Sequence, residues 1–494
     1  MTSLNERLRV FDGPQTRALF VSSTHVSLLD HTKVPYELDR ELEHEEVNQL
    51  RAAHGGPALF WTRSSAGREA AAMITAADSA TAIPVFARIL DDVRIQPLLA
   101  ERGGIWRPVR TLVSEDGSAL GSIWREAGGS VFLPFDPDEV LLNYWSERYL
   151  RIASGAKIRD LRRLLRVIYY RARPWLPRSF QIWLRRRFAR LQARSLFPRW
   201  PIETCFHDFL DLMLAILSDV AGTAIPRIAE WPNGHTWALV LTHDVEQAEG
   251  LAAIEPVVEL ERAHGLRSAW NLVPRRYAVA QKHVIGLLDR GFEVGVHGPY
   301  HDGRDLESFA TWRERLPVAH AAAARWDAAG FRSAALHRDW ELMRLLGFDY
   351  DSSSPDTDPY EPQEGGCCTW YPYFNGELVE LPLTLPQDHT LFVILRQQDE
   401  AAWVEKAAFL RDRGGLALID THPDYLIDER IYSAYARFLD RFSTDETAWK
   451  ALPREVSAWW RRRAASRLER AGDGWRIVGP ASGEARIVFE EGSW

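Results

Sequence analysis

Beyond residue 200, the chain alternates short apolar segments with longer segments of helical periodicity. The apolar segments, which have the length of buried strands, are 237–242, 267–273, 292–296, 331–335, 348–352, 378–381 and 416–420. The helical stretches 279–290, 306–329 and 340–346 are each followed by a glycine placed as a helix C-cap, at Gly291, Gly330 and Gly347. This alternation predicts a parallel sheet, most simply a closed or nearly closed β/α barrel. In such barrels the reactive residues lie at the carboxyl ends of the strands.

The rest of the chain predicts three further parts. Residues 1–150 contain short apolar runs separated by glycine and polar residues, which predicts a small α/β domain with two strands around a turn at Gly128. Near the C-terminus the pattern predicts a helix followed by a hairpin of 475–478 and 485–489. The predicted division is a small α/β domain of unknown role (1–150), an arginine-rich amphipathic helical segment (151–204), the barrel (205–446), and a C-terminal helix and hairpin (447–494).

The segment 151–200 is strongly basic, since one lysine and fourteen arginines accompany a single acid, Asp160. Its apolar residues recur at helical spacing and predict two amphipathic helices divided by Pro174 and Pro177. Two interpretations stay open: a linker whose charges are solvated or paired, or a surface for anionic lipid head groups or phosphate-bearing glycans. We expect no nucleic-acid partner, because no nucleic-acid motif accompanies the charge.

Composition adds limits to this picture. A chain of 494 residues with 46% hydrophobic residues can bury more than one core, and its net charge of -8 does not indicate a polyanion-binding protein. The three cysteines suit a reducing compartment. The first residues lack a secretory signal, and no run of about 20 apolar residues occurs. We therefore expect a cytoplasmic protein, with peripheral contact at the inner membrane face through 151–200 as an additional hypothesis.

Two carboxylates follow the first predicted barrel strand. Asp244 and Glu246 are two residues apart, so both side chains can face one pocket if the segment is extended. Such a pair without a counter-charge raises a pKa or requires a cation. The alternative is a pair of ordinary solvated acids at the end of a strand.

Two histidines follow the strand 292–296. His297 and His301 are four residues apart, and Pro299 favours the first turn of a helix, on which residues four apart share a face. Imidazoles with a neighbouring carboxylate suit zinc and similar divalent transition metals. No glutamate follows His297, so the His-Glu-x-x-His protease motif is absent.

The order of these motifs, followed by an arginine and a late histidine at strand ends, resembles the polysaccharide-deacetylase family, which has a NodB-homology domain and is also called carbohydrate esterase family 4. That family usually begins with Thr-Phe-Asp-Asp-Gly, whereas this chain has Thr242-His243-Asp244-Val245-Glu246. It is similar to a family variant with Asp-Val-Asp, in which the first acid is the base and the second a metal ligand. The resemblance implies a distorted (β/α)7 barrel with Asp244 as base and Glu246 as ligand.

The later motifs complete the resemblance. The second family motif, His-Ser/Thr-x-x-His, keeps both ligand histidines, with Gly298 in place of the hydroxyl residue. The third keeps only its arginine, Arg332, which the resemblance implies orients the base. A structural ion pair is the alternative for Arg332, and Arg338 and His337 are further candidates for the site.

The last family motif is an apolar strand that ends in a histidine, here His422. The resemblance implies that this histidine is the general acid. An imidazolium needs a carboxylate to hold it near neutral pH, and Asp388 is our choice, with Asp420 as the alternative.

The resemblance implies a divalent-metal hydrolase of non-peptide amide bonds, with zinc favoured, acting on an acetylated amino sugar or glycan intermediate. The alternatives are an inactive barrel that binds a glycan or a partner, and a non-sugar amidase of the same superfamily. Aromatic residues that could form a sugar-stacking rim, although they could equally belong to the core, are Tyr300, Trp340, Trp370, Tyr371 and Tyr373.

Overall fold

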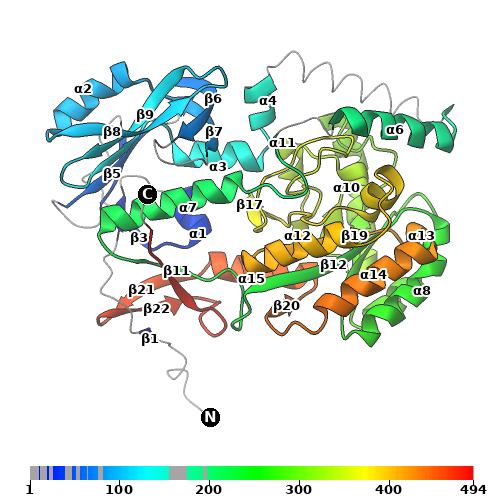
Figure 1. Ribbon diagram of the computed structural model, residues 1–494. Coiled ribbons are helices and arrows are strands. Elements are labelled where there is room, and N and C mark those ends of the chain that lie inside the picture. The colour runs from blue at the N-terminus through cyan, green and yellow to red at the C-terminus, as the bar shows by residue number, and fades with distance from the viewer. Residues whose placement is uncertain are drawn as a thin grey trace, which may run out of the picture. The chain divides into compact units, whose positions relative to one another are not determined.

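The structure is a computed structural model that describes residues 10–11, 19–21, 26–38, 47–51, 56–63, 65–75, 82–154, 175–192, 197–492 and 494. The chain forms two compact units, and each is assembled from segments that are distant in sequence (Figure 1). The first unit consists of Met1–Ile158, Thr204–Asn233 and Arg462–Trp494, and the second of Arg159–Glu203 and Gly234–Arg461.

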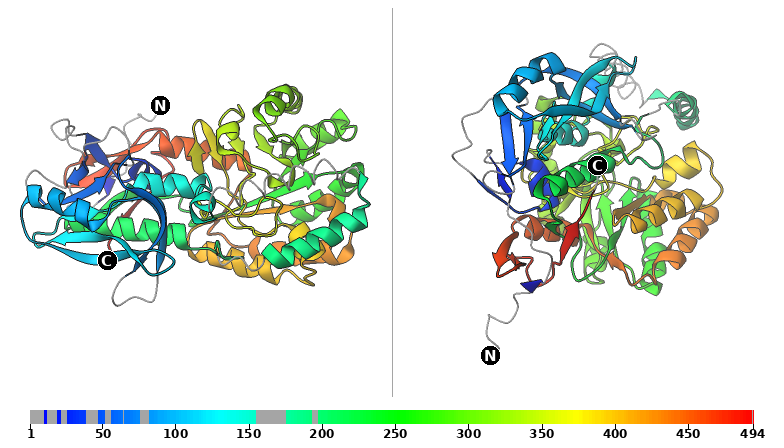
Figure 2. Two further views of the ribbon diagram at one scale, coloured as in Figure 1. Left: turned by 90° about the horizontal axis from the view of Figure 1, so that it is seen from above. Right: turned by 60° about the vertical axis from the view of Figure 1, so that its left-hand side comes forward.

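The first unit contains a curved, largely antiparallel sheet, drawn in blue and cyan in Figure 2. In spatial order its strands are β3 (Tyr36–Leu38), β2 (Leu19–Val21), β4 (Val47–Arg51), β5 (Ala58–Thr62), β10 (Val131–Leu133), β9 (Ala119–Glu126), β8 (Trp106–Val113), β6 (Arg68–Thr75) and β7 (Ile83–Ile89). Its helices are α1 (Ser27–Thr32), α2 (Asp92–Arg102), α3 (Pro137–Trp145), α4 (Tyr149–Ser154) and α7 (Cys205–Ala221). β9 and β10 pair antiparallel on either side of the glycine turn, so the two strands predicted around Gly128 are confirmed.

The remaining strands of the first unit correct the predicted C-terminal hairpin. β22 (Gly474–Val478) pairs with β21 (Arg467–Ala471) and β1 (Val10–Phe11), whereas β23 (Ile487–Glu490) pairs with β11 (Ile225–Ile228). The predicted pairing of 475–478 with 485–489 is therefore wrong. The tight turn after Ala471 brings β21 beside β22, and β23 completes a strand pair with a segment more than 200 residues away.

The units also differ from the predicted boundaries. α7 lies in the first unit because it is apolar on most of its surface and packs against β5, β7, β11 and β23. The segment before Arg462 lies in the second unit, where β20 (Ala448–Lys450) pairs with the first barrel strand. The physical reason is the burial of these apolar faces, which sequence composition alone did not assign to a partner.

The second unit is a β/α barrel. Within its described residues the parallel strands that form the ring are β12 (Trp237–Val245), β13 (Ser268–Leu272), β14 (Glu293–His297), β15 (Gly330–Arg332), β16 (Tyr350–Asp351), β18 (Leu378–Glu380) and β19 (Leu416–Thr421). Each matches a predicted strand. β17 (Tyr373–Asn375) adds an antiparallel strand beside β18.

The ring of strands is closed by the segment that follows β18. The amide N–H of Leu385 donates to the carbonyl of Leu418 (2.9 Å), and the Thr384 hydroxyl donates to the carbonyl of Leu416 (2.7 Å). This segment therefore lies beside β19, which itself pairs with β12. The predicted (β/α)7 architecture is confirmed, and its distortion consists of this irregular seam.

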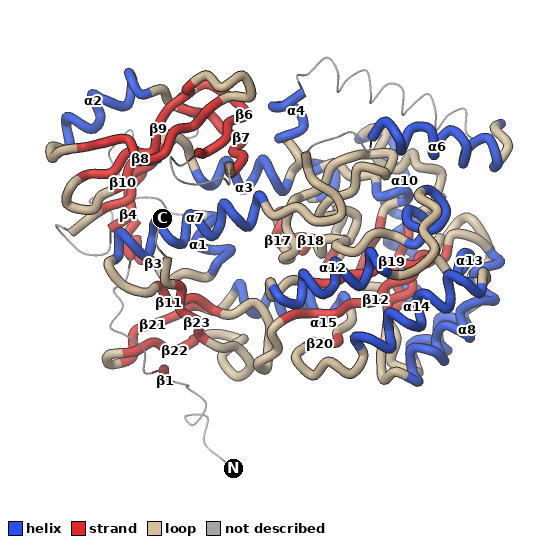
Figure 3. The backbone as a smooth tube through the Cα atoms, viewed as in Figure 1, coloured by secondary structure: helices blue, strands red, loops and turns tan. Residues whose placement is uncertain are grey.

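Helices surround the barrel strands. They are α8 (Ala248–Ala263), α9 (Gln281–Leu288), α10 (Phe309–Trp326), α11 (Trp340–Met343), α12 (Ala401–Asp412), α13 (Pro423–Leu426), α14 (Glu429–Phe442) and α15 (Pro453–Ala464). Figure 3 shows α8, α13 and α14 on the outer side of β12 and β19. Their apolar faces and the outward side chains of the strands form one large core.

Gly330 is the one predicted C-cap glycine that has another role. Gly291 and Gly347 have positive φ, at 81° and 68°, as a left-handed cap requires. α10 instead ends earlier, with Asp327 in the left-handed conformation, and Gly330 is the first residue of β15. A Cβ atom at Gly330 would meet Cζ of Tyr350 at 1.9 Å, so this glycine permits close packing of the Tyr350 ring.

The basic segment contributes one described helix, α6 (Arg178–Gln192). The other amphipathic helix that we predicted before Pro174 lies outside the described residues. None of the described helices is both long and apolar enough to cross a membrane.

Candidate metal and catalytic site

The register of the barrel strands brings polar side chains together at their carboxyl ends. In the pairing of β12 with its neighbours, Asp244 lies opposite Asn271 and Thr242 opposite Asp420. In the next pairings His297 lies opposite Arg332. Because alternate residues of a strand face the same side, these polar side chains share the barrel interior.

Val245 faces the other way. Its side chain is fully buried in the hydrophobic core between the strands and the helices. Strand alternation therefore directs Asp244 and Glu246 into the pocket and the residue between them out of it. This arrangement accounts for an apolar residue at the central position of the motif.

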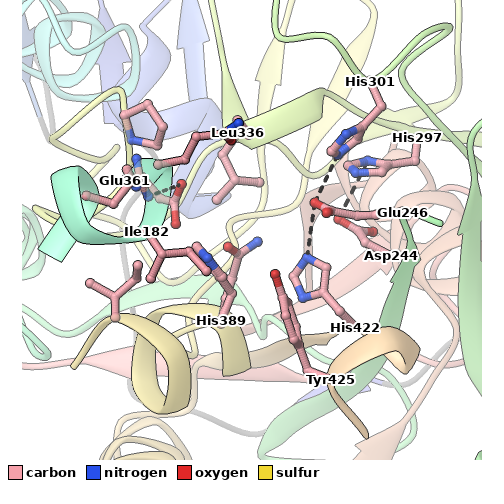
Figure 4. A pocket seen from close by; sticks show the side chains of 16 residues that line it. Ile182, Asp244, Glu246, His297, His301, Leu336, Glu361, His389, His422 and Tyr425 are labelled. Atoms are coloured by element: carbon pink, nitrogen blue, oxygen red, sulfur yellow. Dashed lines mark ion pairs between the residues drawn. The ribbon is translucent and has the colours of Figure 1, made fainter. Parts of the chain in front are cut away.

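Three predicted residues converge as a candidate metal site. One ligand atom from each of Glu246, His297 and His301 lies within 4.8 Å of the other two. Nε2 of His301 is 2.9 Å from Oε1 of Glu246 (Figure 4). Nδ1 of His297 lies 3.3 Å from the carbonyl of Arg332, which favours a proton on Nδ1 and leaves Nε2 as an acceptor.

The chemistry of this triad fits a metal ion. Nε2 of His297 is buried and has no hydrogen-bond partner among the described residues, and the buried Nε2 of His301 faces the Glu246 carboxylate. A buried polar nitrogen without a partner is costly, and a bound cation removes that cost. Burial lowers the pKa of His297 to about 4, so its imidazole is neutral, as a ligand must be.

The two positive-φ residues around the triad shape its loop. Gly298 has φ of 56°, and a Cβ there would meet Oδ2 of Asp305 at 2.9 Å, which explains why no hydroxyl residue stands at this position. His301 has φ of 54°, a left-handed conformation that is uncommon for a non-glycine residue. The conformation at His301 turns its side chain toward Glu246.

Asp244 is held as a buried anion. Its Oδ1 accepts hydrogen bonds from Nδ2 of Asn271 (2.8 Å) and Nη1 of Arg332 (3.1 Å). Burial by itself would raise the pKa of Asp244, but the charge of Arg332, together with that of His422, outweighs it and lowers the pKa to about 2. Its Oδ2 is the oxygen that lies near His297, at 3.6 Å from Nδ1.

Arg332 is buried among polar partners. Its Nη1 is 2.6 Å from Oδ1 of Asp420 and donates to the Thr242 hydroxyl (2.9 Å), while its Nε donates to the carbonyl of Ser352 (3.0 Å). Oxygens of Asp244 and Asp420 and a nitrogen of His422 also lie close enough to hold an ion. Because the Arg332 guanidinium already bridges these two carboxylates, the Glu246 triad is the better metal site.

His422 is paired with Asp388, as predicted in preference to Asp420. Nδ1 of His422 is 2.6 Å from Oδ1 of Asp388, whose Oδ2 accepts the backbone N–H of His422 (2.7 Å). Burial opposes a charge on His422, but the Asp388 carboxylate prevails and holds its pKa well above the usual value. Nε2 of His422 lies 3.7 Å from Oε1 of Glu246, on the side of the pocket (Figure 4).

Other predicted residues lie elsewhere. Arg338 donates to the carbonyls of Leu336 and Gln363, and Nδ1 of His337 lies 3.0 Å from the carbonyl of Gly303; neither residue lines the pocket. The aromatic residues proposed as a sugar-stacking rim do not line it either. Trp370 and Tyr373 are buried in the protein, because their rings fill space beside the strands and helices.

The site contains residues beyond those predicted from the sequence. Asn271 is a polar residue within the otherwise largely apolar strand β13, and its side chain donates to Asp244. Tyr425 lines the pocket from α13, Gln387 from the segment after β18, and Ile182 from α6. No local pattern places these three residues near Asp244.

Fold and site together define a β/α barrel with a candidate metal triad, a buried carboxylate and a carboxylate-held histidine. No family model and no curated protein sequence matches the chain. Solved structures similar to it include proteins described as polysaccharide deacetylases from Mycobacterium smegmatis (19% identity, 49% of this chain and 96% of that one, TM-score 0.38) and Pseudomonas aeruginosa PAO1 (15%, 48% and 94%, 0.39). The Puue allantoinase is also similar (15%, 47% and 93%, 0.39).

Proposed function

We propose that the barrel unit is a metal-dependent hydrolase of the polysaccharide-deacetylase type that removes the acetyl group from an N-acetylated sugar or glycan intermediate. The observation that carries this proposal is the convergence of Glu246, His297 and His301, in which the buried Nε2 of His297 has no hydrogen-bond partner among the described residues. Two imidazoles and one carboxylate form a donor set used by catalytic zinc, which leaves further coordination positions open. Zinc is therefore the metal that we favour.

The surrounding residues can carry the proton transfers. A divalent metal, when bound, supplies a Lewis acid for water and for the amide carbonyl oxygen. Asp244 takes the proton of the attacking water on Oδ2, because Oδ1 is engaged by Asn271 and Arg332. As the new C–O bond forms and the C–N bond breaks, His422 donates its Nε2 proton to the leaving nitrogen, and the products are an amine and acetate.

Metal analysis of purified variants tests this division of roles. We expect wild-type protein to retain about one metal ion per chain, His297→Ala to lose both metal and activity, and Asp244→Asn to keep the metal without turnover. Chelation should abolish activity, and added zinc should restore it. Loss of metal in both variants, or in neither, would contradict the roles of Asp244 and His297.

Substrate assays with the metal-loaded wild-type protein distinguish the proposed function from its two alternatives. An inactive, glycan-binding barrel would release no acetate from any N-acetylated sugar even when loaded with metal. A non-sugar amidase would hydrolyse small linear amides and leave the acetylated sugars intact. A panel of both substrate types therefore decides among the three functions.

We further propose a peripheral membrane location, supported by the outward face of α6. Trp175, just before the helix, is 81% exposed, and Phe180 and Trp183 are also exposed, with their rings stacked 5.6 Å apart. The Arg187 guanidinium lies 5.6 Å from the Trp183 ring. Exposed aromatic rings beside arginine suit the head-group region of an anionic membrane.

A further inference from the structure

The inner face of α6 forms one wall of the candidate active site. Gln181, Ile182 and Arg185 line the pocket that also contains the metal triad. Residues three and four apart lie on one side of a helix, and the next residue on this side, Ala189, is buried against Tyr360 and Ile394. α6 is thus packed on the barrel by the same face that lines the pocket.

Arg186 fixes the helix in this orientation. Its Nε and Nη2 both donate to the carbonyl of Val393, at 3.0 and 2.8 Å. Arg187 is exposed on the opposite side of the helix. The adjacent arginines therefore have different surroundings, and only one of the three, Arg185, lines the pocket.

The guanidinium of Arg185 is not held by a close ion pair within the protein. Its side chain is 18% exposed, and Nη2 lies 3.6 Å from Oε2 of Glu361, longer than a hydrogen bond. Among the described residues Arg185 donates no hydrogen bond, and its charge acts on the buried carboxylate of Asp358 as well as on that of Glu361. Glu361 is buried, also lines the pocket, and accepts a hydrogen bond from the Thr390 hydroxyl (3.2 Å), which holds its carboxylate near the guanidinium.

Arg185 also stands apart from the catalytic groups. Figure 4 shows Ile182 and Glu361 across the pocket from Asp244, Glu246 and the histidines. Of the described residues that line the pocket, Arg185 is the only arginine or lysine. An acidic substrate would be repelled by the carboxylates at the catalytic end, and this cation offers it a favourable position at the other end.

We propose that Arg185 anchors an anionic group of the substrate, so that the pocket selects N-acetylated sugars that carry a phosphate or a carboxylate. This inference rests on the proposed function for the identity of the reacting amide. The planar guanidinium can donate two parallel hydrogen bonds to either anion, which fixes its orientation as well as its charge. Arg185 is thus a specificity-determining residue.

Equilibrium binding to metal-loaded Asp244→Asn protein tests the anchor without requiring turnover. The ligands are N-acetylglucosamine, its 6-phosphate and N-acetylmuramic acid, which differ in charge. We expect at least one acidic sugar to bind about tenfold or more tightly than the neutral sugar, as a charge-assisted hydrogen-bonded pair predicts. Tighter binding of the phosphate or of the carboxylate sugar identifies which anion the pocket takes.

Substitutions on α6 then test whether Arg185 causes the preference for the acidic sugar. Arg185→Gln should remove the preference for the acidic sugar, and Arg185→Lys, which keeps the charge but not the planar fork, should retain part of it. Arg187→Gln is the matched control, because it removes the same charge from the outward face of the same helix. Arg187→Gln should keep the wild-type ratio between the dissociation constants of the neutral sugar and of the preferred acidic sugar.

Two outcomes overturn the anchor. One is equal binding of neutral and acidic sugars by the Asp244→Asn protein. The other is an equal weakening of all three sugars by Arg185→Gln, which would mean that the pair with Glu361 only fastens the helix. The proposed function fails separately, if Arg185-dependent binding of an acidic sugar is found but wild-type protein releases no acetate from it.

Discussion

Replacing Asp388 with asparagine should disable the proposed general acid while preserving the fold. Asp388 makes two short contacts to His422, one to the imidazole Nδ1 and one to the backbone N–H. Each oxygen of Asp388 accepts a backbone N–H, Oδ1 from His389 and Oδ2 from His422, so the amide of Asp388→Asn places its NH2 group against a donor in either orientation. In both orientations the negative charge beside Nδ1 is lost, so the charged form of His422 is disfavoured.

The size of the effect follows from this loss of the acid. General acid catalysis contributes about 10²- to 10⁴-fold to a rate, which corresponds to about 3 to 5 kcal/mol of activation free energy. We expect kcat to fall within that range. Because Asp388 raises the pKa of His422, the pH at which activity declines on the alkaline side should also move to a lower value in Asp388→Asn.

The assay is acetate release from a sugar that the wild-type protein deacetylates, measured across pH with metal content recorded in parallel. Metal should stay bound, since Asp388 is not in the proposed ligand set. Asp424→Asn is the control, because no hydrogen bond or ion pair joins this nearby carboxylate to the imidazole. This substitution should leave kcat close to the wild-type value. A kcat for Asp388→Asn within about threefold of wild type, with the same pH profile, would refute the role of the pair.

Two further predictions concern packing and location. Gly330→Ala would force a Cβ against the Tyr350 ring and should lower the free energy of unfolding, measured in urea, by about 1–3 kcal/mol. Gly286→Ala is the control, because this glycine of α9 has open space around it and its substitution should be neutral or stabilising. Equal effects of the two substitutions would contradict the packing argument. Replacing Trp175 and Trp183 with serine should weaken sedimentation with vesicles that contain anionic lipid, and unchanged sedimentation would exclude these rings as the membrane contact.

Local patterns in the sequence predicted much of the barrel and the centre of its site. Apolar runs indicated each parallel strand, and the two-residue spacing of Asp244 and Glu246 indicated that they share a face. These features depend only on the periodicity of a strand, which is written in adjacent residues. The position of His297 at a strand end was likewise predictable.

The tertiary structure decided which distant groups meet. Sequence alone left Asp388 and Asp420 as alternatives for His422, and only the closure of the barrel beside β19 puts Asp388 on the imidazole and Asp420 on Arg332. The placement of Arg185 was equally hidden, because a run of arginines does not state which one faces inward. Short-range spacing fixes the face of an element, whereas the partners across a pocket depend on register, closure and the burial of apolar surfaces contributed by the whole chain.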